Sequence, residues 1–185
     1  LYNNKVLRVL SKPVMDLDRI TASASPSPNR WSDKLPSREM TKAEIQEMID
    51  AFAKSSKMLK DAGVDGVEVH AVHEGYLLDQ FALKYVNKRT DEYGGSLENR
   101  YRFAAEIVKA IKKECGKDFP VSLRYSIISK TKGFRQGALP GEDYVEVGRD
   151  MEESEIAAKY LQDAGYDMLN CDCLLYTSPS PRDCS

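Results

Sequence analysis

Hydrophobic residues follow a helical period three times along this chain, and each such stretch leads through a glycine into a short alternating run. In the first stretch Thr41 precedes Glu44 by three residues, which is the spacing of a reciprocal capping box at a helix start. Apolar side chains that share one helical face follow it: Ile45, Met48, Ile49, Phe52 and Leu59. The pattern predicts a helix that starts after Thr41 and stops at Gly63.

The second and third stretches repeat this design. Ser96 is expected to cap a helix over about residues 97–114, which Gly116 closes. Its buried stripe is expected to consist of Phe103, Ile107, Val108 and Ile111. A third helix is predicted over about residues 154–164, directly before Gly165.

Each glycine is followed by a predicted strand, over residues 64–70, 119–124 and 168–172. Alternate residues of a strand point to opposite sides, so polar side chains gather on one side near the carboxyl ends. They are Glu68, His70, Ser122, Arg124, Asn170 and Asp172. Helices that alternate with strands predict βαβ units and a parallel sheet, either doubly wound or closed into a barrel. Because an open parallel sheet buries both faces, the polar side favours the mouth of a (β/α)₈ TIM barrel.

The chain divides into three parts. Residues 1–40 hold several prolines, which disfavour helix, and are expected to form a loop or connector. Residues 41–172 hold the three helix and strand units. Residues 173–185 abandon that alternation and begin Cys-Leu-Leu-Tyr-Thr-Ser-Pro-Ser-Pro-Arg-Asp, which resembles the in-frame translation of a sequencing-library adapter. We expect this tail to be non-native; a disordered Pro/Ser tail is the alternative.

Composition excludes several kinds of partner. The chain has 27 Lys and Arg against 29 Asp and Glu, so no global basic field holds nucleic acid. No apolar run reaches the roughly 20 residues of a membrane-spanning helix, and the first residues lack both a Met and a signal core. The four cysteines fit neither a zinc motif nor a disulfide scaffold. We expect a soluble protein of the reducing cytoplasm, away from membranes, whose start has been cut.

Candidate chemistry lies at the end of the first predicted strand. Both histidines of the chain, His70 and His73, are followed directly by Glu74, Gly75 and Tyr76. The spacing is not that of a zinc-protease helix and no third ligand is evident, so a metal site is the weaker hypothesis. Two converging imidazole N–H groups can instead hold and polarise a carbonyl oxygen. Tyr76, protonated at neutral pH, can act as a general acid.

Two long motifs within residues 36–172 resemble a known family. They read His-Ala-Val-His-Glu-Gly-Tyr-Leu-Leu-Asp-Gln-Phe at 70–81 and Asn-Lys-Arg-Thr-Asp-Glu-Tyr-Gly-Gly-Ser-Leu-Glu-Asn-Arg at 87–100. They resemble the signature of the old yellow enzyme family, the NADH:flavin oxidoreductases. The resemblance is strongest to its larger members: 2-enoate reductases, 2,4-dienoyl-CoA reductases and bile-acid-inducible steroid flavoproteins. It implies that residues 41–172 are part of an FMN-binding TIM barrel, expected to be strands four to six.

The resemblance also implies a reaction. In that family FMN is reduced by NADH or NADPH and delivers hydride to the β-carbon of an activated alkene, which is an enoate, an enoyl- or dienoyl-CoA ester or an unsaturated steroid. By the resemblance, His70 and His73 bind the substrate's carbonyl oxygen and Tyr76 protonates the α-carbon. Arg124 matches the arginine beside the pyrimidine edge of the flavin. Glu74 is a departure, because many smaller members place Gly-Tyr directly after the second donor.

Several further expectations come with the resemblance. Larger relatives commonly carry a 4Fe–4S cluster and a C-terminal FAD-containing pyridine-nucleotide domain, which would fall beyond residue 172. An amine-oxidising flavoprotein on the same scaffold is an alternative function. A second alternative is an inactive truncated product, because the late barrel loops that hold the flavin phosphate in the family would be missing from this chain.

Two segments are assigned to structure and access rather than to chemistry. Residues 91–96 place Gly94 and Gly95 before a helix, but Asp91 and Glu92 would repel a phosphate, so a structural turn is expected. The loop from Tyr125 to about Glu153 is long for a connection between a strand and a helix. We expect that loop to shape substrate access.

Overall fold

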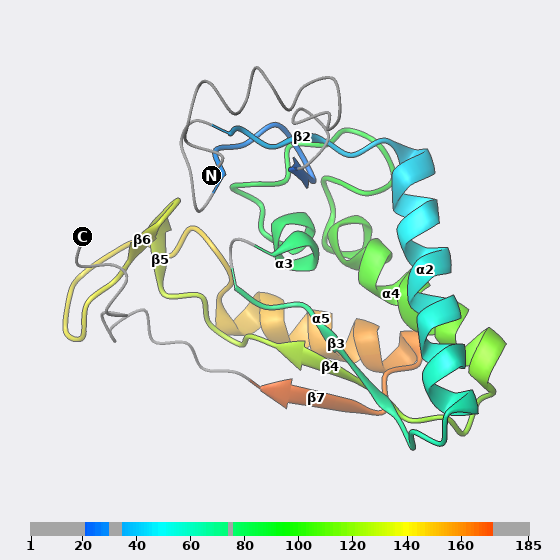
Figure 1. Ribbon diagram of the computed structural model, residues 1–185. Coiled ribbons are helices and arrows are strands. Elements are labelled where there is room, and N and C mark those ends of the chain that lie inside the picture. The colour runs from blue at the N-terminus through cyan, green and yellow to red at the C-terminus, as the bar shows by residue number, and fades with distance from the viewer. Residues whose placement is uncertain (1–20, 30–34, 74–75, 172–185) are drawn as a thin grey trace.

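The structure is a computed structural model that describes residues 21–29, 35–73 and 76–171 (Figure 1). The tail at 173–185 lies outside the described residues, as do the first 20 residues and Asp172. Glu74 and Gly75, inside the first motif, also lie outside them. The helix and strand units predicted over residues 41–172 therefore fall almost entirely within the described part of the chain.

A three-stranded parallel sheet forms the base of the molecule. Its strands are β3 (Val67–His70), β4 (Val121–Tyr125) and β7 (Met168–Cys171), in the order β3-β4-β7. The spatial order thus follows the chain order without the reversal that marks a doubly wound sheet. Successive right-handed connections then place every crossover helix on the same face, as in one sector of a barrel.

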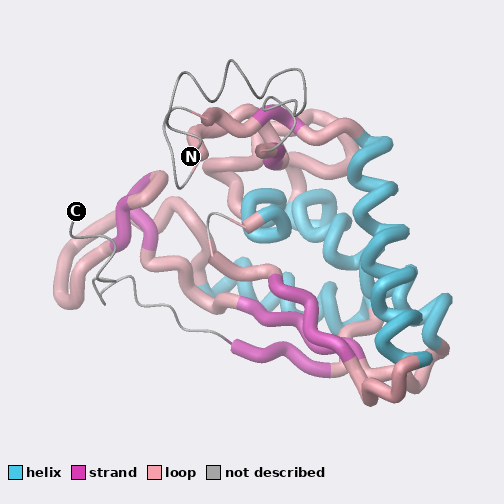
Figure 2. Tube along the Cα trace, viewed as in Figure 1, coloured by secondary structure: helices cyan, strands magenta, loops and turns pink. Residues whose placement is uncertain are grey.

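The helices cover that one face, as Figure 2 shows. They are α2 (Lys42–Asp61), α4 (Leu97–Cys115) and α5 (Met151–Ala164), and α4 packs against both of the others. Strand residues that point toward the helices are buried in a common core: Val69, Val121, Leu123 and Tyr125. The polar residues of the same strands lie on the opposite side, which is the predicted division of the two faces.

The predicted helix starts are confirmed for α2 and α4. Thr41 and Glu44 form the reciprocal capping box, and the Ser96 hydroxyl accepts a hydrogen bond from the Asn99 N–H. The third helix begins three residues earlier than expected, at Met151. Asp150 caps it by accepting from the Glu153 N–H at 2.8 Å, and this cap lies ahead of the apolar period on which the prediction depended.

The apolar residues predicted to share one face of α2 are only partly buried. Ile45 and Ile49 are buried, but Met48 is 37% exposed and Leu59 is 45% exposed. The face that packs against α4 continues instead through two small side chains, Ala53 and Ser56. Small residues allow the two helices to approach closely, and hydrophobicity alone does not reveal such positions.

Short elements occupy the connections, and periodicity did not predict them. A helical turn, α3 (Leu77–Ala82), follows the histidine motif. The loop after β4 contains an antiparallel hairpin of β5 (Thr131–Gly133) and β6 (Gln136–Gly137), which extends beyond the carboxyl ends of the sheet (Figure 1). In the N-terminal connector, β1 (Ala22–Ser23) pairs in parallel with β2 (Arg38–Glu39). Elements of two to six residues are too short to show a period.

Candidate active site

Three aromatic side chains of the first motif meet at the carboxyl end of β3. The rings of His70 and His73 lie edge to face, with centroids 5.0 Å apart. The ring of Tyr76 lies 4.7 Å from that of His70 and 5.6 Å from that of His73. The structure therefore brings together all three residues that the sequence singled out for carbonyl binding and proton transfer.

The backbone around His70 favours one tautomer of its imidazole. The Val72 N–H points at His70 Nδ1 across 3.5 Å, at the long end of hydrogen-bond range. A nitrogen that accepts a hydrogen bond carries no proton, so the proton of the neutral ring belongs on Nε2. His70 is thereby prepared to donate from Nε2, which is the polarity that a carbonyl oxygen requires.

His73 is held in an unusual backbone conformation. Its φ is +79°, in the left-handed region that few residues other than glycine enter, although asparagine, aspartate and histidine do so more often than the rest. The Tyr76 N–H donates to the His73 carbonyl oxygen at 2.8 Å and closes the chain over this turn. Such a conformation costs of order 1 kcal/mol or more, and it persists where surrounding structure enforces it. Here it directs the His73 ring toward His70 and Tyr76.

Tyr76 stands at the N-terminal boundary of α3. Its side chain makes no capping hydrogen bond, and the residue is 46% exposed. The side chain is therefore partly open to solvent, while its ring rests against His70. A half-exposed tyrosine in this position can both reach a ligand and regain a proton from water.

Arg124 lies beside this cluster on the neighbouring strand. It is the register partner of His70 on β3 and of Asn170 on β7, and the Ala71 N–H donates to its carbonyl oxygen at 3.1 Å. Its side chain, on the polar side of the sheet, is half-buried. A guanidinium offers a permanent positive charge and several N–H donors in one plane. That donor set fits the pyrimidine edge of a flavin, whose reduced form is anionic.

A polar group supports the site one layer deeper. Glu68 Oε2 accepts hydrogen bonds from Ser122 Oγ at 2.9 Å and from Asn170 Nδ2 at 3.0 Å, so one carboxylate joins all three strands. Within the described residues, no group of three or more His, Cys, Asp or Glu side chains is arranged to hold a metal ion. The described helices include none that is long and apolar enough to cross a membrane.

Comparison with protein-family models matches residues 12–173 to the NADH:flavin oxidoreductase / NADH oxidase family. This chain belongs to that family. The NADH:flavin oxidoreductases are the oxidoreductase enzymes that the two sequence motifs indicate, and the three parallel units are part of their (β/α)₈ barrel.

Individual family members show how much of the fold is present. The chain is 55% identical over 160 residues to cinnamate reductase from Clostridium sporogenes, across 86% of this chain and 24% of that protein. It is 51% identical over 81 residues to N,N-dimethylglycine/sarcosine dehydrogenase from Chromohalobacter salexigens, across 44% of this chain and 12% of that protein. The solved 2-naphthoyl-CoA reductase complex with 2-naphthoyl-CoA matches with a TM-score of 0.64 and 36% identity, across 81% of this chain and 21% of that one. The chain therefore spans about a quarter of the length of the cinnamate reductase it matches.

The second motif of this NADH:flavin oxidoreductase is structural, as its acidic residues indicated. The buried Arg89 donates to the carbonyl oxygens of Ala24 and Met40, at 3.0 and 2.7 Å, and pairs with Asp91 at 2.6 Å. That guanidinium holds the pKa of Asp91 below its usual value. The motif thus fastens the N-terminal segment to the connection between α3 and α4, and Asp91 is engaged by Arg89 in doing so.

Sequence reasoning missed the buried charges behind the site. Arg149 and Asp79 form an ion pair at 2.8 Å with side chains 1% and 6% exposed, and Arg100 pairs with Glu153 at 2.9 Å in similar burial. The available signal was a carboxylate in the mainly apolar helix Leu77–Ala82. A charge amid apolar neighbours requires a buried partner, but the sequence did not identify which residue provides it.

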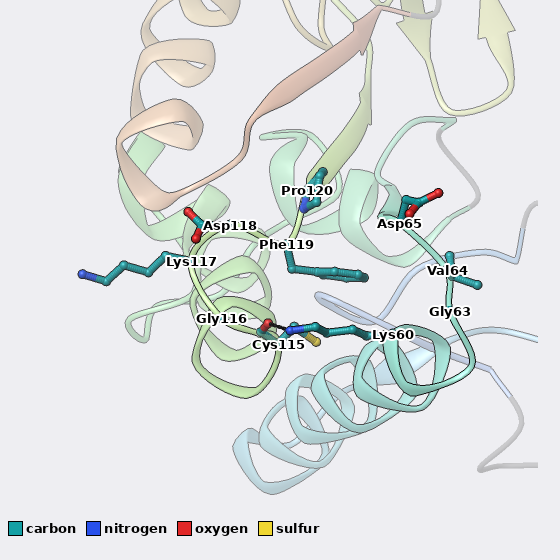
Figure 3. Close-up of a pocket in the computed structure, with 10 residues that line it drawn as sticks. All are labelled: Lys60, Gly63, Val64, Asp65, Cys115, Gly116, Lys117, Asp118, Phe119 and Pro120. Carbon is teal, nitrogen blue, oxygen red and sulfur yellow. Dashed lines mark hydrogen bonds between the residues drawn. The ribbon is translucent and has the colours of Figure 1, made fainter.

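A hollow of about 430 Å³ lies at the other end of the sheet (Figure 3). It is lined by residues that precede β3 and β4, among them Asp65 and Pro120. Lys60 Nζ crosses it and donates to the Cys115 carbonyl oxygen at 2.5 Å, and burial raises the pKa of the Cys115 thiol. In barrels this end serves stability rather than catalysis, so the hollow is separate from the histidine cluster.

Proposed function

We propose that this chain forms the catalytic sector of an FMN-dependent NAD(P)H oxidoreductase that reduces the C=C bond of an activated alkene. The observation that carries the proposal is the convergence of the His70, His73 and Tyr76 rings beside Arg124. Two donors and one acid on the same side of the sheet match the charges that develop when a conjugated carbonyl compound is reduced.

In this proposal each side chain has one task. His70 Nε2–H and a ring N–H of His73 donate to the substrate's carbonyl oxygen and stabilise the negative charge that develops there. The chemistry that FMN would supply when bound and reduced is a hydride for the β-carbon. Tyr76 gives its phenolic proton to the α-carbon, and the resulting tyrosinate regains a proton from water. Arg124 would hold the pyrimidine edge of the flavin by hydrogen bonds and charge.

The substrate class follows from the carbonyl-binding pair. An enoate, an enoyl-CoA ester or an unsaturated steroid each presents a carbonyl oxygen conjugated to the alkene. The 55% identity to cinnamate reductase supports an aryl-substituted enoate as the first compound to test. We place the enzyme in the cytoplasm, with NADH or NADPH as reductant. A 4Fe–4S cluster and FAD would belong to sequence beyond residue 172.

The test begins with the gene. Sequencing outward from these 185 codons shows whether residues 173–185 continue a natural reading frame, and the complete frame is then expressed. We expect flavin absorption bands that bleach with NADH or NADPH under anaerobic conditions and return on addition of cinnamate. An added iron–sulfur shoulder would place the enzyme with the larger enoate reductases. A colourless protein after reconstitution with FMN would overturn the cofactor assignment.

Tyr76→Phe tests the proton donor in that protein. Loss of the phenolic proton should slow alkene reduction by about 10²-fold or more, because general acid catalysis contributes on that scale. FMN content and the rate of flavin reduction by NAD(P)H should remain unchanged. Unchanged alkene turnover in this variant would exclude Tyr76 as the donor.

Amine oxidation is the second candidate, favoured by the 51% identity to N,N-dimethylglycine/sarcosine dehydrogenase over 81 residues. The two functions move electrons in opposite directions at the flavin. Dimethylglycine or sarcosine would bleach the oxidised protein if it is an amine dehydrogenase, whereas cinnamate would reoxidise the reduced protein if it is an ene-reductase. One measurement of flavin absorbance with each substrate therefore distinguishes the two functions.

A further inference from the structure

The position of Tyr76 is not set by its own helix. The helix α3 has six residues, and isolated helices of that length are unstable in water. Tyr76 occupies the N-cap position without making a capping hydrogen bond. Whatever holds α3 against the rest of the molecule therefore also holds the phenol.

A buried ion pair provides that hold in the first turn of α3. Asp79 Oδ1 accepts from Arg149 Nη2 at 2.8 Å, and both side chains are almost completely enclosed, at 6% and 1% exposed. Asp79 lies three residues after Tyr76, so the ion pair acts within one helical turn of the phenol. In such an enclosed place a charged hydrogen bond is strong, and it is costly to leave one partner alone.

The same guanidinium also contacts the strand that carries Arg124. Arg149 Nη1 donates to the Ser126 carbonyl oxygen at 3.1 Å, two residues beyond Arg124, and its charge lies 5.3 Å from the centre of the Tyr125 ring. Arg149 Nε donates to the Tyr101 hydroxyl on α4 at 2.7 Å. One buried side chain thus connects α3, α4 and the carboxyl end of β4.

We propose that Arg149 and Asp79 are positioning residues that fix Tyr76 relative to Arg124, and so fix the proton donor relative to the flavin. This inference rests on the proposed role of Tyr76. Neither residue touches the reacting atoms, because both are enclosed behind the site. Proton transfer to carbon requires close approach, and a displacement of about 1 Å at a reacting group can cost on the order of 10²-fold in rate.

Loss of the ion pair between Asp79 and Arg149 should slow only the oxidative half-reaction, in which Tyr76 donates its proton to the alkene. In the holoenzyme, Asp79→Asn removes the counter-charge at almost constant volume. We expect cinnamate to reoxidise the reduced protein about tenfold to hundredfold more slowly, on the scale of such a displacement. The rate of flavin reduction by NADH should stay within about twofold of wild type. Reoxidation by molecular oxygen, which needs no proton at carbon, should also be unchanged.

The stability of α3 can also be measured directly, without any turnover. Hydrogen exchange of the backbone amides of residues 77–82 should rise in Asp79→Asn, while exchange in the middle of α4 stays as in wild type. Glu153→Gln is the control for loss of another buried counter-charge, because Glu153 pairs with Arg100 and the substitution leaves Asp79 and Arg149 intact. Arg100 also donates to the carbonyl oxygen of Ala82, so this control is read by rate and not by exchange in α3. We expect that control to keep the wild-type rate of reoxidation by cinnamate.

A second variant covers the case in which Asp79→Asn does not fold. Replacing both partners, in Asp79→Leu/Arg149→Met, removes the buried charges together and is expected to preserve the fold. It should still reoxidise slowly with cinnamate. The inference is overturned if the double variant matches wild type, or if the single variant slows cinnamate, NADH and oxygen reactions equally. Failure of the proposed function would be a separate result. If cinnamate does not reoxidise the wild-type holoenzyme, hydrogen exchange of residues 77–82 in wild type and in Asp79→Asn still shows whether the ion pair anchors α3.

Discussion

At the scale of single residues, His73 combines a proposed role with a strained backbone. Asparagine enters the left-handed region more readily than histidine does and offers an amide N–H in place of the ring N–H. With φ at +79°, we expect His73→Asn to be as stable as wild type or more stable by up to ~1 kcal/mol. It should keep most of the alkene-reduction rate of the complete enzyme.

His73→Ala is the comparison that isolates the donor. Alanine keeps the unfavourable φ and loses the N–H, so alkene reduction should fall by about 10²-fold, as on removal of one oxyanion donor. Stopped-flow reoxidation by cinnamate gives the rates, and thermal unfolding gives the stabilities. If the asparagine variant were as slow as the alanine variant, the imidazole itself, and not merely an N–H, would be required.

The residues of the candidate site differ in how far the sequence could predict them. His70 and Arg124 each end a strand of alternating residues, and parallel strands bring such ends together, so their proximity could be predicted. The ion pair of Asp79 and Arg149 spans 70 positions of sequence, and no local pattern links its two members. Long-range partners of buried charges depend on the packing of whole elements, which a single sequence does not encode locally.

At the scale of elements, the start of α2 contains an ion pair that should titrate. The bidentate hydrogen bonds from Arg38, followed by the Thr41 N–H, lower the pKa of Glu44 from 4.5 to about 2. A carboxyl group with a lowered pKa stabilises the folded state fully above its ordinary value and loses that contribution as the pH falls toward 2. The cap should therefore weaken progressively below pH 4.5.

Glu44→Gln tests this at the helix. The side chain is partly exposed, so we expect a loss of about 1 kcal/mol at pH 7, within the range of a lost cap or a surface ion pair. The difference from wild type should shrink as the pH falls below 4.5, because protonation removes the same charge from wild type. Urea unfolding at several pH values measures it, with Glu47→Gln, an exposed residue of the same helix, as control. A difference that is constant with pH would show that the charge of Glu44 does not contribute.

The elements themselves were predictable in proportion to their length. The helices α2 and α4, with 20 and 19 residues, show several turns of period and a capping signal, and both were predicted within a residue or two. The helix α3 and the hairpin of β5 and β6 are set by contacts with the rest of the fold, such as those of Asp79, and offered no period to read. The helix α3 begins directly after Tyr76, so one of the least predictable elements adjoins the candidate site.

At the scale of the whole molecule, the sheet has two edges that a barrel would not have. Within the described residues β3 and β7 each pair with β4, and their outer edges present unpaired backbone groups. Met168 at the β7 edge is 57% exposed, and Ile156 on α5 is 52% exposed. In a closed (β/α)₈ barrel neighbouring units would cover both. A polypeptide of these 185 residues alone should therefore expose apolar surface and strand edges.

We expect that polypeptide, expressed alone, to associate or to bind a hydrophobic dye such as ANS, and to retain no FMN after gel filtration. Arg124 provides one edge of the proposed flavin site, but a single guanidinium cannot offset the entropy of binding a cofactor. A longer reading frame that supplies the other strands of the barrel should instead elute as a yellow protein. Light scattering, ANS fluorescence and visible absorption, measured on the two proteins in parallel, test whether the shorter chain associates and whether it holds FMN. Stoichiometric FMN on a monodisperse 185-residue chain would mean that the phosphate-binding elements lie within this sequence, and the assignment of the flavin site would then move from the absent loops to the residues around Arg124.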